Sequence, residues 1–309
     1  MTTGTTPGNS PMTTDHRTTG MTTDGKSGMD QSMAIDTEKL DEDGFLLLPA
    51  FLGGDELGSV NKAVDDFYAA RAERGERETG SRSQWRTFVS GPFYHEPLDD
   101  LAFHPVYAEW ARRVLRTDDV RMTKYNVWRK TGGTANYDQP LHRDYRDQDL
   151  LTPLSAAAPY QIAFLTYLDD VTPGNGPTAV VPRSAAPAIA PEITELDREQ
   201  RAEVYAREIR LDAAAGDTLV LPTDTWHRAT DITDHGAVRT MFTVMFRRAD
   251  AEWCGQRSWP SYAHENGFQR LVGRLDDAQR RLLGFPPADW SGWTDELRDA
   301  LARRYPGRG

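Results

Sequence analysis

The segment LHRDYRDQD, residues 141–149, contains side chains suited to binding a metal ion. His142 and Asp144 are separated by one residue, and residues two apart in an extended strand project to the same face. An imidazole nitrogen and a carboxylate oxygen on one face are suitable ligands for a divalent metal. The pair alone is weak evidence, because one His-x-Asp arises easily by chance in an acidic protein with 7 histidines. A further ligand in a similar setting is needed.

His227 and Arg239 provide two further signals. His227 ends the apolar, strand-like run GDTLVLPTDTWH, and two imidazoles with one carboxylate form the facial triad that binds Fe(II) and leaves coordination positions open. Arg239 begins VRTMFTVMF, where Met241, Thr243 and Met245 alternate with it and suggest an inward face. A buried guanidinium is costly unless a carboxylate faces it, and its fork matches the two oxygens of a carboxylate. The residues therefore predict a metal site beside an anion site.

The elements that must position these residues are short strands. Residues from about 120 to 247 contain alternating or β-branched runs separated by Pro, Gly and Asn, which indicates a sheet-rich core. Helical patterns precede it within 55–118 and follow it in the C-terminal region, 250–309. Helices, then strands, then helices, without βαβ alternation, predict a mainly β fold: an antiparallel barrel or jelly roll with flanking helices. We expect one domain over 34–309.

Residues 1–33 differ in composition from the rest of the chain. They are rich in Thr, Gly, Ser and Asp, contain almost nothing large and apolar, and repeat MTT three times. Such a segment cannot bury enough surface to offset its ordering entropy, so we expect a disordered tail. Whether the segment is a functional tail or part of an over-long reading frame stays open. Several methionines are alternative starts: Met12, Met21, Met29 and Met33.

Composition excludes several classes of protein. The net charge of −11 argues against a nucleic-acid partner, which requires a basic face. No window approaches the roughly 18 apolar residues of a membrane span, and the N-terminus lacks a basic segment followed by an apolar one. Cys254 is the single cysteine, so no intrachain disulfide forms. We expect a cytoplasmic protein with a small-molecule substrate and no membrane partner; the oligomeric state stays open.

The metal and anion residues together resemble the Fe(II)/2-oxoglutarate oxygenases, and in particular the phytanoyl-CoA dioxygenase family. The stretch YQIAFLTYLDDVTPGNGPTAVVPRSA is similar to that family's strand, turn and strand after the His-x-Asp, and the resemblance covers about residues 40–247. It implies a double-stranded β-helix (jelly roll, cupin-like). It also implies that His142, Asp144 and His227 bind Fe(II), and that Arg239 binds the distal carboxylate of 2-oxoglutarate.

The resemblance implies an activity as well. Such a dioxygenase uses O2 to decarboxylate 2-oxoglutarate and couples this to oxidation, most simply hydroxylation, of an unactivated C–H bond. Halogenating relatives replace the carboxylate ligand by Gly or Ala, so Asp144 favours a hydroxylase. Residues 182–185, PRSA, depart from the family's Pro-Gly-Ser-His, so substrate contacts do not carry over there. The substrate stays open among an amino acid, an acyl thioester and an antibiotic intermediate of bacterial secondary metabolism.

Further cosubstrate-binding residues are expected on the neighbouring strands. Lys124, Asn126 and Trp128 share one face of the strand before the His-x-Asp, which in the family runs beside the cosubstrate. For these three residues, both pocket lining and ordinary packing stay open as roles. The same two alternatives hold for Gln161. Lys124 and Arg228 are the alternatives to Arg239 as the carboxylate-binding cation.

Two other classes of function remain. One is a non-redox jelly-roll metalloprotein, either a small-molecule binding module or a metal-dependent hydrolase. Such a protein needs no buried arginine near the metal, and a hydrolase needs a carboxylate base nearby. The other is a structural barrel without metal, which would leave His142, Asp144 and His227 without a shared purpose. Arg239 is the residue that distinguishes these classes from an oxygenase.

Overall fold

The computed structural model describes most of the chain: residues 35–74, 88–133, 136–144, 150, 159–186, 196–255 and 257–307. The chain divides into two units, Met1–Ser32 and Met33–Gly309, and every element below belongs to the second unit. The tail expected at residues 1–33 lies outside the described residues, so its predicted disorder stays a prediction.

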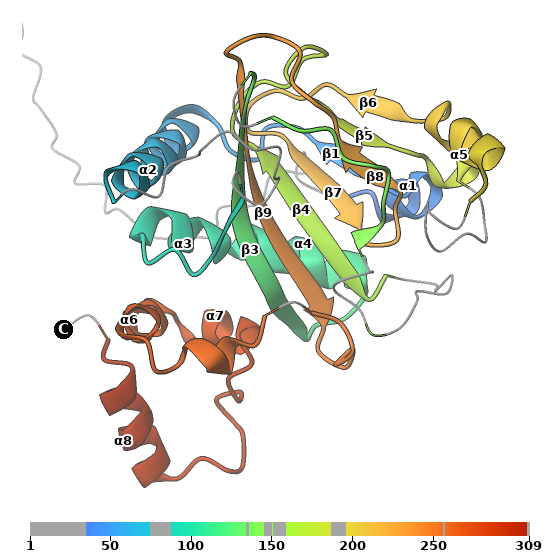
Figure 1. Cartoon of the computed structure of the whole chain (residues 1–309). Coiled ribbons are helices and arrows are strands. Elements are labelled where there is room, and N and C mark those ends of the chain that lie inside the picture. The colour runs from blue at the N-terminus through green and yellow to red at the C-terminus, as the bar shows by residue number, and fades with distance from the viewer. Residues whose placement is uncertain are drawn as a thin grey trace, which may run out of the picture. The chain divides into compact units, whose positions relative to one another are not determined.

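Two antiparallel sheets face each other (Figure 1). The six-stranded sheet has the order β1-β7-β4-β9-β3-β2, with β1 Leu46–Leu48, β2 Phe88–Ser90, β3 Val120–Thr131, β4 Gln161–Tyr167, β7 Thr218–Pro222 and β9 Val238–Arg248. The three-stranded sheet has the order β6-β5-β8, with β5 Thr178–Val180, β6 Ile209–Leu211 and β8 His227–Ala229. The predicted mainly β fold with flanking helices is confirmed.

Strand β9 shows how the sequence pattern separates two environments. Phe242, Val244 and Phe246 belong to the core between the six-stranded sheet and the helices. Met241 and Met245 belong to the core between the two sheets. Because side chains alternate along a strand, Arg239 and Thr243 share the inner face with the methionines. The regular alternation of β9 thus places charged and polar groups between the sheets.

The helices are α1 Thr37–Asp43, α2 Gly54–Glu73, α3 Glu96–Ala102, α4 Pro105–Leu115, α5 Arg198–Tyr205, α6 Asn266–Arg274, α7 Asp277–Leu282 and α8 Asp295–Arg304. Helices α2, α3, α4 and α6 pack on the outer face of the six-stranded sheet, whereas α5 lies beside the three-stranded sheet. Helix α4 crosses β3, β9 and β4 in Figure 1. Its Tyr107 and Trp110 pack on Phe164 of β4, and the Tyr107 hydroxyl lies 2.7 Å from the hydroxyl of Thr166. This packing supports the strands that carry the inner-face residues.

The C-terminal region is anchored on β3. The indole N–H of Trp259 donates to the carbonyl of Met122 at 2.8 Å, and its ring stacks on Tyr125 with centroids 5.9 Å apart. Phe268 of α6 stacks on the other side, 6.5 Å from Trp259. The helices expected in 250–309 are therefore present, with α6 packed into the same core. No helix in the described part of the chain is long and apolar enough to cross a membrane.

The predicted boundaries need three corrections. Strand β2 lies inside the region 55–118 that the pattern predicted as helical, and β1 precedes the region expected to hold the strands. Helix α5 lies within 120–247, the region predicted as the sheet core. Strands β1 and β2 have three residues each, which is too short to show alternation; they form because their backbones pair with β7 and β3.

Candidate active site

Three side chains of metal-binding type converge at one end of the space between the sheets. Ligand atoms of His142, Asp144 and His227 all lie within 4.8 Å of one another. The carboxylate Oδ1 of Asp144 is 3.7 Å from Nε2 of His142 and 3.8 Å from Nε2 of His227. No other group of three such residues with this spacing occurs in the described ranges. The donor set therefore fits one divalent metal ion.

The local structure that brings His142 and Asp144 together differs from the expected strand. His142 forms a single antiparallel bridge with His227, through backbone hydrogen bonds of 3.0 and 2.9 Å. Asp144 lies outside any strand, and its N–H donates to the carbonyl of Thr223 at 2.9 Å. The prediction of strand alternation at this pair was wrong, although the predicted convergence is present. Backbone bonds to the β7–β8 turn, rather than pleating, aim the carboxylate at the imidazoles.

Both imidazoles are oriented by backbone carbonyls. Nδ1 of His142 lies 2.9 Å from the carbonyl of Pro140, and Nδ1 of His227 lies 2.9 Å from the carbonyl of Thr225. A carbonyl only accepts, so Nδ1 carries the proton and Nε2 presents its lone pair to the site. Burial, and then the neighbouring His142, lowers the pKa of His227 to about 4. His227 is therefore neutral near pH 7 and available as a ligand.

A cavity of about 700 Å³ opens beside the three residues. This volume lies within the range of small-molecule sites, about 300–1,000 Å³. Lys124, Asn126 and Trp128 line it, so the pocket-lining alternative is confirmed for these three. Gln161 does not line it. This buried residue begins β4, where its backbone lies opposite Arg247 of β9.

Arg239 lies buried at the cavity wall. Its side chain is 1% exposed, one terminal N–H donates to the carbonyl of Gly176, and Nε has no hydrogen-bond partner among the described residues. Burial lowers the pKa of the guanidinium, while the nearby Tyr137, Tyr167 and Asp169 act in the opposite direction. A buried cation with an unsatisfied donor is costly unless a ligand completes it. The geometry fits a carboxylate-bearing ligand.

Asn126 and Thr243 add further polar atoms that the protein leaves unsatisfied. The two residues lie opposite each other on β3 and β9, are 1% and 5% exposed, and both line the cavity. Neither amide atom of Asn126 nor the hydroxyl of Thr243 has a hydrogen-bond partner in the described part of the chain. Buried polar atoms are normally satisfied, so these atoms also favour a polar ligand.

Arg228, an alternative anion-binding residue, is unsuited to that role. It neighbours His227 on β8 but projects to the opposite face and does not line the cavity. Its guanidinium forms two hydrogen bonds with the carboxylate of Glu208, both 2.7 Å long, and an ion pair with Asp138. The cation is therefore already neutralised by protein carboxylates.

The sequence patterns missed Lys130 and Arg257. Lys130 is fully buried, and its Nζ donates to the carbonyls of Thr230 and, at 2.7 Å, Tyr137. Burial, and then the nearby Arg239, lowers the pKa of Lys130 to about 6. Extending the alternation of Lys124, Asn126 and Trp128 by one step would have found it. Arg257 lines the cavity from the C-terminal region, and no periodicity marks it.

The fold and the site together define a jelly-roll metalloprotein with a buried arginine facing its cavity. A profile of the family "Phytanoyl-CoA dioxygenase (PhyH)" matches residues 40–240. The chain belongs to the phytanoyl-CoA dioxygenase family, and it is therefore an Fe(II)/2-oxoglutarate-dependent oxygenase. No curated protein sequence matches it significantly.

Solved structures share the fold. HygX from Streptomyces hygroscopicus, solved with nickel and 2-oxoglutarate bound, has a TM-score of 0.53 at 17% identity, over 71% of this chain and 93% of its own. The carbocyclase SnoK from nogalamycin biosynthesis has a TM-score of 0.55 at 20% identity, over 71% of this chain and 85% of its own. The epimerase SnoN from the same biosynthesis has a TM-score of 0.54 at 19% identity, over 69% of this chain and 79% of its own. These likenesses confirm the jelly-roll fold.

Proposed function

We propose that His142, Asp144 and His227 bind the Fe(II) of this oxygenase and that Arg239 binds the distal carboxylate of 2-oxoglutarate. The observation that carries the proposal is the combination of two pre-oriented imidazoles and one carboxylate with a buried, incompletely satisfied guanidinium on the same cavity. HygX, with the same fold, binds nickel and 2-oxoglutarate. The group expected at the three ligands is Fe(II), with O2 as the oxidant.

The chain's own residues have three tasks in this reaction. When bound, the metal would supply the redox chemistry in which one oxygen atom of O2 enters succinate, the other oxidises the substrate, and CO2 leaves. Arg239 orients the cosubstrate, and the backbone carbonyls behind the two histidines keep both Nε2 atoms directed at the site. The apolar inner face, including Met241 and Met245, excludes water from the reacting groups.

We propose hydroxylation of an unactivated C–H bond as the outcome. The carboxylate of Asp144 is present, whereas halogenating relatives have Gly or Ala at this position. Solved structures of the same fold include an epimerase and a carbocyclase, so the fold supports several oxidative outcomes. The cavity volume favours a small-molecule substrate, as for the nogalamycin biosynthetic enzymes.

The cavity disfavours the hydrolase alternative. Asp144 is the only carboxylate among the described residues that line it, so a hydrolase using this residue as a ligand would lack a carboxylate base. Among the residues that the structure describes, four cations line the cavity: Lys124, Arg143, Arg239 and Arg257. This positive lining in a protein of net charge −11 suits a dianionic cosubstrate.

The test of the proposed function is product analysis. Candidate substrates are screened by the extra succinate that they release from 2-oxoglutarate, and the product is then formed under oxygen-18 gas in excess chloride. We expect Fe(II)-dependent succinate formation and a product that gains one oxygen atom from O2 and no chlorine. Chlorination with Asp144 in place would contradict the hydroxylase proposal, and hydrolysis without succinate would favour the alternative class.

Replacing Asn126 with leucine tests the unsatisfied amide. Leucine is close in size, and removing unpaired buried polar atoms relieves a cost of about 1–3 kcal/mol. We therefore expect the melting temperature of the metal-free protein to rise by a few degrees, by differential scanning calorimetry, while affinity for 2-oxoglutarate falls. Thr243→Val is the matched variant on the neighbouring strand, β9. Unchanged affinity in both variants would remove these residues from the cosubstrate site.

A further inference from the structure

Residues 136–144 carry two of the three proposed ligands but form no strand of their own. Backbone hydrogen bonds attach this segment to β8: Gln139 N–H donates to the carbonyl of Ala229 at 2.9 Å, and His142 and His227 exchange two bonds. The side-chain carbonyl of Gln139 also accepts from the N–H of Ala229 at 2.9 Å. The distances from His142 and Asp144 to His227 therefore depend on how residues 136–144 lie against β8.

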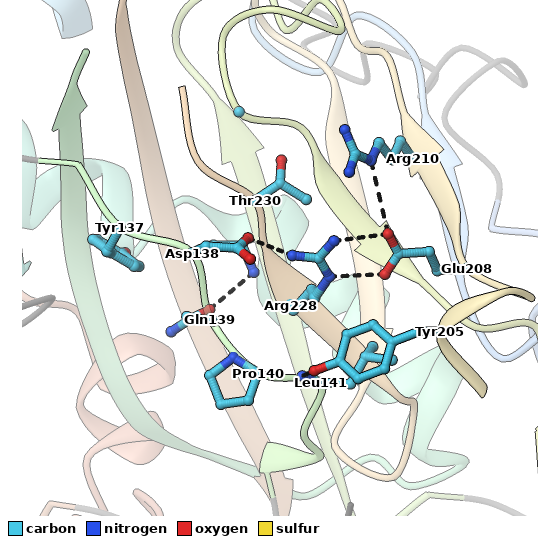
Figure 2. A network of polar contacts seen from close by, with 12 residues as sticks. Tyr137, Asp138, Gln139, Pro140, Leu141, Tyr205, Glu208, Arg210, Arg228 and Thr230 are labelled. Carbon is cyan, nitrogen blue, oxygen red and sulfur yellow. Dashed lines mark hydrogen bonds and ion pairs between the residues drawn. The ribbon is translucent and has the colours of Figure 1, made fainter. Parts of the chain in front are cut away.

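The outer side of the same junction holds a buried ionic network (Figure 2). Arg228 follows His227 on β8, so it projects away from the cavity. Figure 2 shows its guanidinium between two carboxylates, that of Asp138 in the ligand-bearing segment and that of Glu208. The side chains of Arg228 and Glu208 are only 6% and 13% exposed. The side chain of Asp138 is 56% exposed, so the network joins the segment to β8 and to the polypeptide before β6 through a desolvated Arg228–Glu208 pair and a solvent-exposed carboxylate.

Ala179 explains how Arg228 reaches Glu208 across an intervening strand. Ala179 of β5 stands opposite Arg228 of β8 on one side and Arg210 of β6 on the other. Its small side chain leaves the guanidinium room to cross β5. Arg210 lies at the edge of the network, with Nε 3.8 Å from the Glu208 carboxylate and its side chain 53% exposed. Arg210 is therefore a peripheral member with little expected effect.

Tyr205, at the end of α5, provides a second attachment. Its hydroxyl accepts a hydrogen bond of 3.0 Å from the backbone N–H of Leu141, the residue directly before His142. The guanidinium carbon of Arg228 lies 5.6 Å from the centre of its ring, within the range of cation–π contacts. The same cation therefore contacts both the phenol that binds Leu141 and the Asp138 carboxylate of the ligand-bearing segment.

We propose that Asp138, Tyr205, Glu208 and Arg228 form an outer clamp that sets the spacing of His142 and Asp144 relative to His227 and thereby the metal affinity. This inference rests on the proposed function. Arg228 is a positioning residue, since it does not touch the cavity and acts through the segment that it holds. Its two parallel bonds to Glu208 require the planar fork of arginine, which the point charge of lysine reproduces only in part.

The test compares Tyr205→Phe and Arg228→Gln with Arg210→Ala, a control in the same network. Binding of Mn(II) alone is measured by electron paramagnetic resonance. Loss of the partners that orient metal ligands typically weakens metal affinity by about 10–100-fold. We therefore expect the Mn(II) affinity to fall about tenfold in Arg228→Gln and by less in Tyr205→Phe. In Arg210→Ala it should not change. Arg228→Lys should restore part of the affinity. If Arg228→Gln does not fold, Tyr205→Phe, which loses a single hydroxyl, decides.

Hydrogen exchange of the metal-free protein separates the clamp from the proposed function. We expect faster exchange in residues 136–144 of the two clamp variants, with circular dichroism melting curves still cooperative, and native exchange in Arg210→Ala. Mn(II) affinity and exchange equal to the native values in Tyr205→Phe and Arg228→Gln would overturn the clamp. Native protein that fails to bind Mn(II) would contradict the proposed function, and with it the clamp's role in metal affinity.

Discussion

Replacing Arg239 with alanine is expected to raise the dissociation constant for 2-oxoglutarate well over tenfold. The guanidinium is buried, and its Nε has no hydrogen-bond partner among the described residues, so a bound carboxylate would complete it. Loss of one partner from a buried, hydrogen-bonded charge pair costs about 2–5 kcal/mol. Isothermal titration of 2-oxoglutarate into metal-loaded protein, with Mn(II) or with Fe(II) under anaerobic conditions, measures this change.

Two further variants make the Arg239 result specific. Arg239→Lys should recover only part of the affinity, because an ammonium cannot reproduce two parallel bonds to a carboxylate. Arg248→Ala is the matched control, since Arg248 lies on the same strand but pairs with Asp250 at the surface. We expect native affinity in the control. Native affinity in both Arg239 variants would redirect the anion site to Lys124, because Arg228 is already paired with Glu208 and Asp138.

Replacing His227 or Asp144 with alanine is expected to abolish stoichiometric metal binding. Each supplies one of three protein ligands, and the loss of an outer partner alone costs about 10–100-fold in affinity, so the loss of a ligand should cost more. Anaerobic Fe(II) titration followed by metal analysis of the desalted protein measures the retained ion. Neither variant should bind a full equivalent.

His235→Ala is the control for the ligand variants. His235 is exposed and does not line the cavity, so its loss should leave metal binding unchanged. The melting curve of each metal-free variant shows whether the fold has survived. Full Fe(II) occupancy in folded His227→Ala and Asp144→Ala would refute the ligand assignment.

Regular strands made part of the site predictable from the sequence. Arg239 and Thr243 lie on the same face of β9, and Lys124, Asn126 and Trp128 together line the cavity from β3. Side chains in a strand repeat every two residues, so an inward face can be identified from its apolar members alone.

Other parts of the site depend on contacts that periodicity does not encode. Asp144 is aimed by a backbone bond to Thr223 rather than by a strand, and Arg257 enters the cavity wall from beyond the sheets. Glu208 and Arg228 meet across a strand because Ala179 between them is small. Gln161 begins β4, and its strand position alone did not show whether it would reach the cavity.

The most direct measurement is an anaerobic titration of the native protein with 2-oxoglutarate, with and without Fe(II). We expect binding of one equivalent of Fe(II), followed by one equivalent of 2-oxoglutarate, with a visible charge-transfer absorption that appears only when both are present. Without the metal, 2-oxoglutarate should bind much more weakly. Native protein that binds neither, or that binds 2-oxoglutarate equally well without Fe(II), would contradict the assignment of a shared metal and cosubstrate site.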